Sequence, residues 1–124
     1  MTKSIDVLLV DEDKETLTLA ETFLERKSDY IVVQTETDPS VAIERLVDGE
    51  FDCVVSDYRM PTMNGVELFE TVHEHRDIPF FLFTGSKAED IGLDVCEDTI
   101  GYVQKGVGTA HYDELVEGIE SRCQ

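Results

Sequence analysis

The chain alternates five times between a short apolar run and a longer segment with helical periodicity. The apolar runs lie at residues 5–10, 30–33, 51–56, 79–84 and 100–104. Runs that are apolar almost throughout are typical of parallel strands buried on both faces. Because parallel neighbours need a crossover connection, the helical segments between them must cover the sheet. The pattern therefore predicts one α/β domain over residues 1–124, with a doubly wound, five-stranded parallel sheet and helices on both faces.

Capping residues mark where several of the expected helices begin. Asp13 precedes the first helical pattern, and Asp38-Pro39 offers an N-cap followed by proline at the first helical position. The expected helices cover residues 14–26, 39–48, 66–76, a segment opening at the capping box Ser86-Lys87-Ala88-Glu89, and 112–119.

The charge of the chain is strongly negative, with 28 acidic against 10 basic residues and a formal net charge of −18. Such a surface repels phosphate backbones, so we expect no direct binding of nucleic acid. The acidic residues are distributed among regular apolar segments and form no separate tail. Distributed carboxylates with few lysines favour a protein that works in high salt, where self-repulsion is screened.

No apolar run is long enough to span a bilayer, and the first residues lack the features of a signal peptide. The three cysteines are widely spaced and form no CxxC pair, which predicts reduced thiols: Cys53, Cys96 and Cys123. The three histidines lack metal-ligand spacing and are expected to be solvated: His73, His75 and His111. We therefore expect a cytoplasmic protein without a membrane segment.

Polar side chains follow four of the five expected strands. Asp11 and Glu12 follow the first strand and Asp57 the third, while Thr84 ends the fourth and Lys105 follows the fifth. Open parallel sheets bind their ligands beyond the carboxyl ends of the strands, where these side chains should meet. Any one of them alone is explained as a cap or a surface charge, but their coincidence at one edge predicts a site.

The chemistry of these groups narrows the function. Crowded carboxylates repel one another, and a hard divalent cation relieves that repulsion. Oxygen ligands without a nearby His or Cys favour Mg²⁺, which binds through one or two carboxylates and keeps several waters. A cation and Lys105 would neutralise a phosphoryl group while a carboxylate attacks in line. The predicted site is therefore suited to phosphoryl transfer.

Over essentially its whole length the sequence resembles the receiver domain of two-component response regulators. The resemblance rests on LLVDED at the first strand end, VVSDYRMPTMNG around Asp57, FLFTGS with Thr84, and GYVQK with Lys105. It implies a flavodoxin-like fold and a signalling switch that catalyses only its own phosphorylation and dephosphorylation. The acidity and the Gln-Lys-Gly ending of the fifth strand further resemble receivers of haloarchaeal sensor proteins.

The same resemblance implies a role for each matching residue. Asp57 would accept phosphate from a histidine kinase or a phosphotransfer protein. Mg²⁺ would be held by side chains and by one backbone carbonyl, from Asp11, Glu12, Asp57 and Arg59. Glu12 departs from the aspartate usual at its position, and we expect the longer side chain to change the affinity for Mg²⁺.

The resemblance also implies how the switch works. Thr84 would hydrogen-bond the phosphoryl group, Lys105 would pair with it, and Tyr102 would rotate as Thr84 moves inward. The surface formed by residues 86–119 would then bind a downstream output domain or protein, or a second copy of the chain. Gly106 replaces a proline usually joined by a cis bond. Because a non-proline cis bond costs roughly 2.5–4 kcal/mol, we expect a rearranged loop.

Two alternatives remain open at this stage. A pseudo-receiver that binds partners without phosphorylation is favoured by the departures at Glu12 and Gly106. An aspartyl-phosphate phosphatase is suggested by LLVDEDKETL, which loosely resembles the DxDxT opening of haloacid-dehalogenase-type enzymes but is off by one residue. The sequence contains no recognisable output domain, so it is either a stand-alone receiver or a unit of a longer chain.

Overall fold

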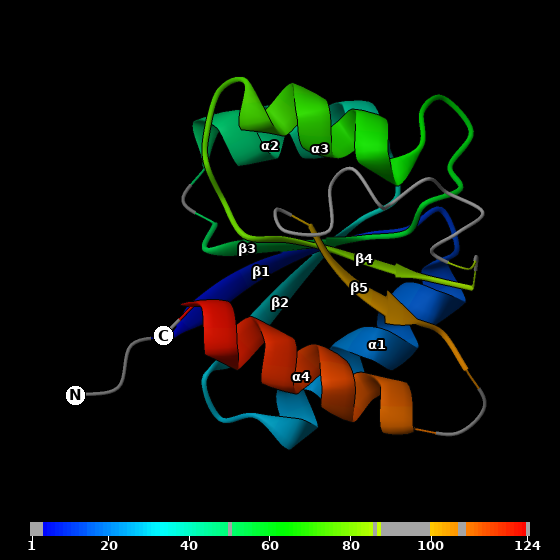
Figure 1. Cartoon of the computed structure of the whole chain (residues 1–124), viewed down its shortest axis with the longest axis vertical. Helices are drawn as coiled ribbons and strands as arrows, with labels where there is room; N and C mark the ends of the chain where they lie inside the picture. The colour runs from blue at the N-terminus through cyan, green and yellow to red at the C-terminus, as the bar shows by residue number, and fades with distance from the viewer. Residues whose placement is uncertain (1–3, 50, 86, 88–99, 107–108, 124) are drawn as a thin grey trace.

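Five parallel strands form one sheet in the order β2-β1-β3-β4-β5 (Figure 1). The computed structural model describes residues 4–49, 51–85, 87, 100–106 and 109–123. Every neighbouring pair of strands is parallel. The strands are β1 Ile5–Val10, β2 Ile31–Glu36, β3 Cys53–Ser56, β4 Phe80–Thr84 and β5 Ile100–Gln104. The chain runs outward from β1 to β2 and then crosses back to β3, so the strand order reverses between β1 and β3.

Helices cover both faces of the sheet, as the alternating pattern predicted. The described helices are α1 Lys14–Lys27, α2 Pro39–Asp48, α3 Gly65–His73 and α4 Ala110–Cys123. Figure 1 shows α2 and α3 on one face, and α1 and α4 on the other. This confirms the doubly wound α/β fold.

Each strand divides its side chains between two apolar cores because successive residues point to opposite faces. In β1, Val7 and Leu9 join the core under α1 and α4, whereas Leu8 and Val10 join the core under α2 and α3. All four are buried. Burial on both faces explains why the strand sequences are apolar without alternation.

Local capping determines several helix ends. The carboxylates of Asp13 and Asp38 accept the N–H groups of Glu15 and Ser40, which confirms both as N-caps. The predicted extension of the third helix to Arg76 is wrong, because α3 ends at His73. The guanidinium of Arg76 instead donates to backbone carbonyls near the end of α2. The helix expected to open at residues 86–89 lies outside the described residues.

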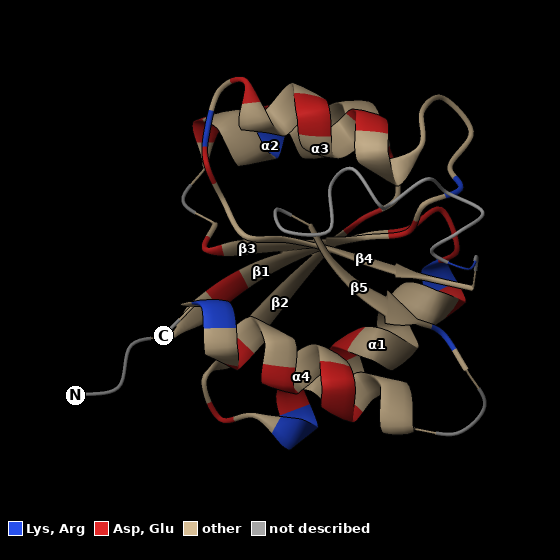
Figure 2. Cartoon of the chain, viewed as in Figure 1, with Lys and Arg blue, Asp and Glu red and all other residues tan. Residues whose placement is uncertain are grey.

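Acidic residues are distributed over both helical layers and several strand ends (Figure 2). Within the described part of the chain, no helix is long and apolar enough to cross a membrane.

Candidate functional site

The polar residues that follow the strands are held by the last hydrogen bonds of the sheet. The N–H of Asp11 donates to the carbonyl of Glu36 at 3.2 Å, and that of Asp57 donates to the carbonyl of Val10 at 2.9 Å. The N–H of Lys105 donates to the carbonyl of Thr84 at 2.8 Å. These hydrogen bonds fix the backbone of Asp11, Asp57 and Lys105 at one edge of the sheet, near the point where the strand order reverses.

Asp11, Asp57 and Lys105 meet at this edge and form a charged cluster, here called the acidic edge. The Lys105 ammonium lies 2.9 Å from Oδ2 of Asp11 and 3.8 Å from Oδ2 of Asp57. The second oxygen of each carboxylate accepts a backbone N–H, from Asp13 to Asp11 and from Tyr58 to Asp57. Asp11 is only 4% exposed, so its charge depends on these partners. One ammonium thus serves two carboxylates that would otherwise repel each other.

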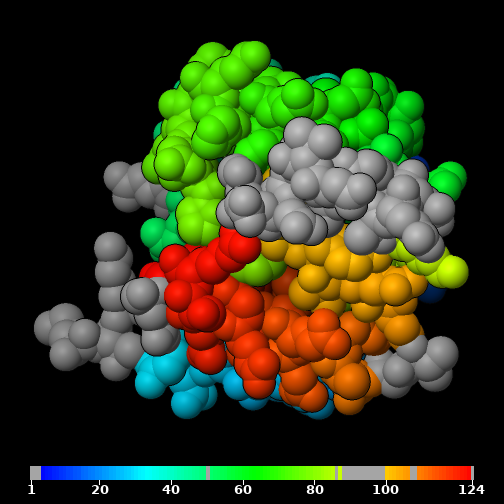
Figure 3. Space-filling view, in the orientation of Figure 1, coloured from blue at the N-terminus to red at the C-terminus, as the bar shows by residue number. Residues whose placement is uncertain are grey.

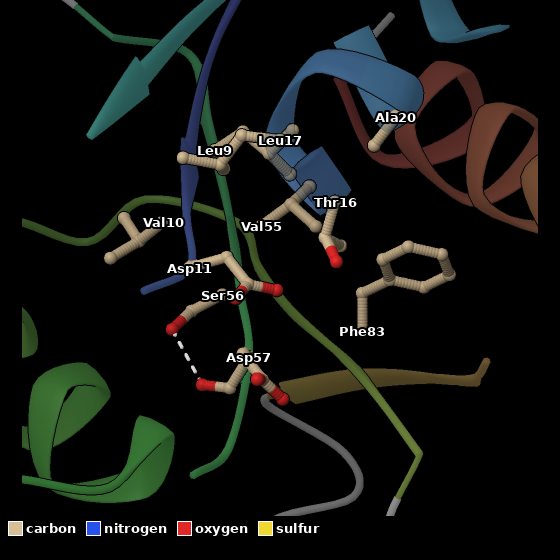
Figure 4. A pocket seen from close by; sticks show the side chains of 10 residues that line it. All are labelled: Leu9, Val10, Asp11, Thr16, Leu17, Ala20, Val55, Ser56, Asp57 and Phe83. Carbon is tan, nitrogen blue, oxygen red and sulfur yellow. Dashed lines mark hydrogen bonds between the residues drawn. The ribbon is translucent and has the colours of Figure 1, made fainter. Parts of the chain in front are cut away.

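The acidic edge lies on the α1 side of the sheet. Figure 4 shows Asp11, Ser56 and Asp57 beside a narrow gap lined mainly by apolar side chains, including those of Leu17 and Phe83. The gap has no room for a water-sized molecule, so it is a packing space beside the acidic edge and not a binding cleft.

Thr84 and Tyr102 belong to neighbouring strands on the other side of the sheet. Thr84 is 1% exposed at the end of β4, and Leu82, two residues earlier, pairs with Tyr102 of β5. Tyr102 is partly buried and packs with Leu82 against the α2 and α3 core. The alternation of side chains turns Thr84 to the same face as Leu82, diagonal to Tyr102.

Two of the predicted metal ligands, Glu12 and Arg59, are exposed. Over the described ranges, no three His, Cys, Asp or Glu side chains are grouped closely enough to hold a metal ion. The structure therefore brings together Asp11 and Asp57 from the predicted set but does not gather Glu12 with them. The two carboxylates of Asp11 and Asp57 still fit Mg²⁺, because that ion needs only one or two protein carboxylates and keeps several water ligands.

The Asn64-Gly65 end of the stretch VVSDYRMPTMNG has a structural explanation that sequence reasoning missed. Asn64 caps α3, and its side chain and that of Glu67 each accept the other's backbone N–H. A Cβ at Gly65 would lie 2.6 Å from the carbonyl oxygen of Asp57. The hydroxyl of Ser56 donates to that same carbonyl at 2.8 Å. Ser56 and Gly65 therefore fix the backbone that carries the Asp57 side chain.

The expectation that His111 is solvated is wrong. His111 is 9% exposed, and its ring centroid lies 4.2 Å from that of Tyr112 and 5.4 Å from that of Phe83. Its Nδ1 accepts the N–H of Gly106 at 3.3 Å. Burial lowers the pKa of His111, Glu114 opposes this effect, and Lys105 reinforces it. The packing against Phe83, which local sequence does not encode, accounts for the burial of this histidine.

Residues 7–117 match the response regulator receiver domain. This match, together with the five-stranded parallel sheet and the acidic edge, defines the class of protein. The chain belongs to the response regulator receiver domain family.

Similar proteins include whole receivers and receivers within larger chains. A two-component response regulator of Arabidopsis thaliana is 27% identical over 113 residues, which cover 91% of this chain but 18% of that protein. The chemotaxis protein CheY-3 of Vibrio cholerae is 25% identical over 126 residues, covering 98% of this chain and 96% of that protein. The crystal structure of a receiver domain protein from Methanospirillum hungatei superposes with a TM-score of 0.82 at 21% identity, covering 98% and 94% of the two chains. The chain thus spans about a fifth of the plant relative and nearly all of the chemotaxis protein.

Proposed function

We propose that residues 1–124 form one phosphoryl-accepting receiver unit, in which Asp57 takes phosphate from a histidine kinase or a phosphotransfer protein. The observation that carries this proposal is the acidic edge, where one ammonium faces two carboxylates at the ends of β1 and β3. A carboxylate oxygen of Asp57 attacks phosphorus, the P–N bond of the donor's phosphohistidine breaks, and the imidazole leaves with the electron pair. The chain transforms no other substrate and is not an enzyme in the metabolic sense.

The acidic edge and the residues around it have separate tasks in this reaction. Lys105 pairs with the phosphoryl oxygens, and Thr84 hydrogen-bonds them once they arrive. Asp11, Asp57 and the Arg59 carbonyl would hold Mg²⁺, with Glu12 reaching the ion by a rotamer change or through water. Bound Mg²⁺ would supply charge neutralisation of the phosphoryl oxygens.

Phosphorylation is expected to change the surface that includes β5 and α4. The new charge and acceptor oxygens draw Thr84 inward, and Tyr102 rotates into the space vacated beside β4. Figure 3 shows β5 and α4 side by side on one exposed face. That face would then bind a downstream output domain or protein, or a second copy of the chain. The strong negative charge suits a cytoplasmic setting of high salt, such as that of a halophilic archaeon, and disfavours nucleic acid as a partner.

The test of phosphoryl transfer is mass spectrometry after incubation with phosphoramidate and Mg²⁺. The wild-type chain should gain one acid-labile phosphate, and the Asp57→Asn variant should gain none. Asp52→Asn is a suitable control, since Asp52 lies at the opposite end of β3, where its carboxylate accepts the N–H of Asp6. Undiminished labelling of Asp57→Asn would refute the assignment. No labelling of the wild type would favour a pseudo-receiver.

The test of the switch is NMR with and without beryllofluoride, a mimic of the phosphoryl group. Shifts are expected at Thr84, Tyr102 and along α4. Changes confined to the loops that carry Asp11 and Asp57 would contradict the switch.

A further inference from the structure

A hydrogen bond connects α4 to the segment that carries Lys105. The N–H of Gly106 donates to Nδ1 of His111 at 3.3 Å. Gly106 directly follows Lys105, whose ammonium contacts Asp11 at 2.9 Å. His111 is the second residue of α4 and is 9% exposed, whereas Gly106 is exposed, so the bond is buried on its acceptor side. The backbone next to the catalytic lysine is therefore attached to a helix on the surface.

The ring of Phe83 contacts both His111 and the Lys105 ammonium. The centroid of the His111 ring lies 5.4 Å from that of Phe83, and the Lys105 ammonium lies 5.5 Å from the same Phe83 centroid. Tyr112 also packs against His111, and the centroids of the two rings lie 4.2 Å apart. These contacts restrict the imidazole to an orientation in which Nδ1 meets the Gly106 N–H.

Gly106 matters through its N–H and not through its lack of a side chain. Among the described residues, a Cβ built at this position meets nothing nearer than Nδ1 of His111, at 4.0 Å. Alanine would therefore fit beside them and still donate the hydrogen bond. Proline would not, because it has no backbone N–H. Gly106 and His111 thus form a donor–acceptor pair that a proline after the lysine would abolish.

We infer that His111 is a positioning residue for phosphoryl transfer, whose neutral imidazole accepts the Gly106 N–H and holds Lys105 toward Asp11 and Asp57. This inference rests on the proposed function. Protonation turns Nδ1 from an acceptor into a donor, so the imidazolium faces the Gly106 N–H with no bond to make. Acidification then releases the segment and lowers the rate at which Asp57 is phosphorylated.

The surroundings of His111 favour the neutral ring near pH 7. Phe83 of β4 and Tyr112 of α4 present aromatic faces to it, and burial lowers its pKa. The described charges that act on it are Glu114 of α4, which raises the pKa, and Lys105 after β5, which lowers it. Protonation of His111 is therefore expected only at a pH below the ordinary pKa of histidine.

The first test does not require phosphorylation. In the ¹⁵N-labelled full chain, neutral His111 should carry its proton on Nε2, because Nδ1 is the acceptor. On titration from about pH 8 to about pH 5, the Gly106 amide resonance should shift with the same midpoint as the His111 ring. A Gly106 amide that is unresponsive across that titration would overturn the inference, whatever the fate of Asp57.

The second test measures labelling by phosphoramidate and Mg²⁺ in paired variants. His111→Phe and Gly106→Pro each remove one partner of the bond and should slow labelling by roughly three- to tenfold. His111→Asn, whose Oδ1 can replace Nδ1 as acceptor, and Gly106→Ala should stay near the wild-type rate. Relative to His111→Asn, which does not titrate, the wild type should slow as the pH falls.

The two tests separate this inference from the function on which it rests. If His111→Phe is labelled at the same rate as the wild type at every pH, His111 has no positioning role, and the proposed receiver function is unaffected. If the wild type is not labelled, the proposed function fails, and the Gly106 titration still decides whether His111 holds this segment.

Discussion

Replacing Gly65 by alanine tests whether close packing requires a glycine at the end of the stretch VVSDYRMPTMNG. A Cβ at Gly65 would lie 2.5 Å from Cδ2 of Leu82 and 2.6 Å from the carbonyl oxygen of Asp57. Leu82 is fully buried, and the Asp57 carbonyl already accepts the Ser56 hydroxyl, so neither neighbour can move without disturbing the core or the site. Overpacking of this kind costs about 1–3 kcal/mol. Alanine recovers up to about 1 kcal/mol through its higher helix propensity.

The Gly65→Ala variant is therefore expected to lose roughly 1–2 kcal/mol of unfolding free energy. This corresponds to a fall in Tm of about 4–8 °C for a chain of this size. Labelling of Asp57 should also slow, because the backbone that carries its side chain is displaced. Urea unfolding at constant, high monovalent salt measures the first effect, and mass spectrometry after incubation with phosphoramidate measures the second.

Gly85→Ala provides a matched control at the same edge of the sheet. A Cβ at Gly85 meets no atom of the described residues within 4 Å, so the unfolding free energy of this variant should change by no more than about 0.5 kcal/mol. Equal urea midpoints for the two alanine variants would refute the steric reasoning.

Four further outcomes are expected. At fixed monovalent salt Mg²⁺ should raise the Tm, and Asp11→Asn should remove most of that gain; equal melting with and without Mg²⁺ would count against the site. Monovalent salt should itself raise the urea midpoint, because it screens a net charge of −18; a flat salt profile would contradict the halophilic interpretation. Lys105→Met should lower the unfolding free energy by about 1–2 kcal/mol, because it leaves the buried Asp11 carboxylate, which is 4% exposed, without its ammonium partner. Lys27→Met is the control, since it removes only a surface ion pair with Asp113, worth about 0–1 kcal/mol. Because folding lowers the pKa of His111, the unfolded chain binds a proton at higher pH than the folded chain does. The unfolding free energy should therefore decrease as the pH is lowered from about 6.5 towards the pKa of folded His111. His111→Asn should show a smaller decrease, and identical pH profiles for this variant and the wild type would contradict the prediction.

Much of the fold was predictable because its signals are local. Strands buried on both faces must be apolar throughout, and capping residues such as Asp13 and Asp38 act on the next few residues of the chain. The five strands and the doubly wound arrangement were therefore predicted correctly, with errors at element ends such as Arg76. That residue completes a helical pattern, but α3 ends at His73 and the Arg76 guanidinium donates to the carbonyl of Leu46 in α2.

The acidic edge was predictable in outline for a similar reason. Parallel strands end at one edge of a sheet, so residues after the strands must lie near one another. The sequence placed Asp11, Asp57 and Lys105 there, and Thr84 at the end of the fourth strand. It did not determine that Lys105 contacts both carboxylates, or that Glu12 turns away into solvent.

The sequence by itself determined the elements, their alternation and the edge at which the polar residues collect, since each depends on neighbours along the chain. Only the tertiary structure decided which side chains touch. Lys105 reaches Asp11 across 94 positions, and His111 is buried because α4 packs it against Phe83 of β4. Such contacts depend on the order of strands and the packing of helices over them, and no local periodicity encodes the distance between two residues far apart in the chain.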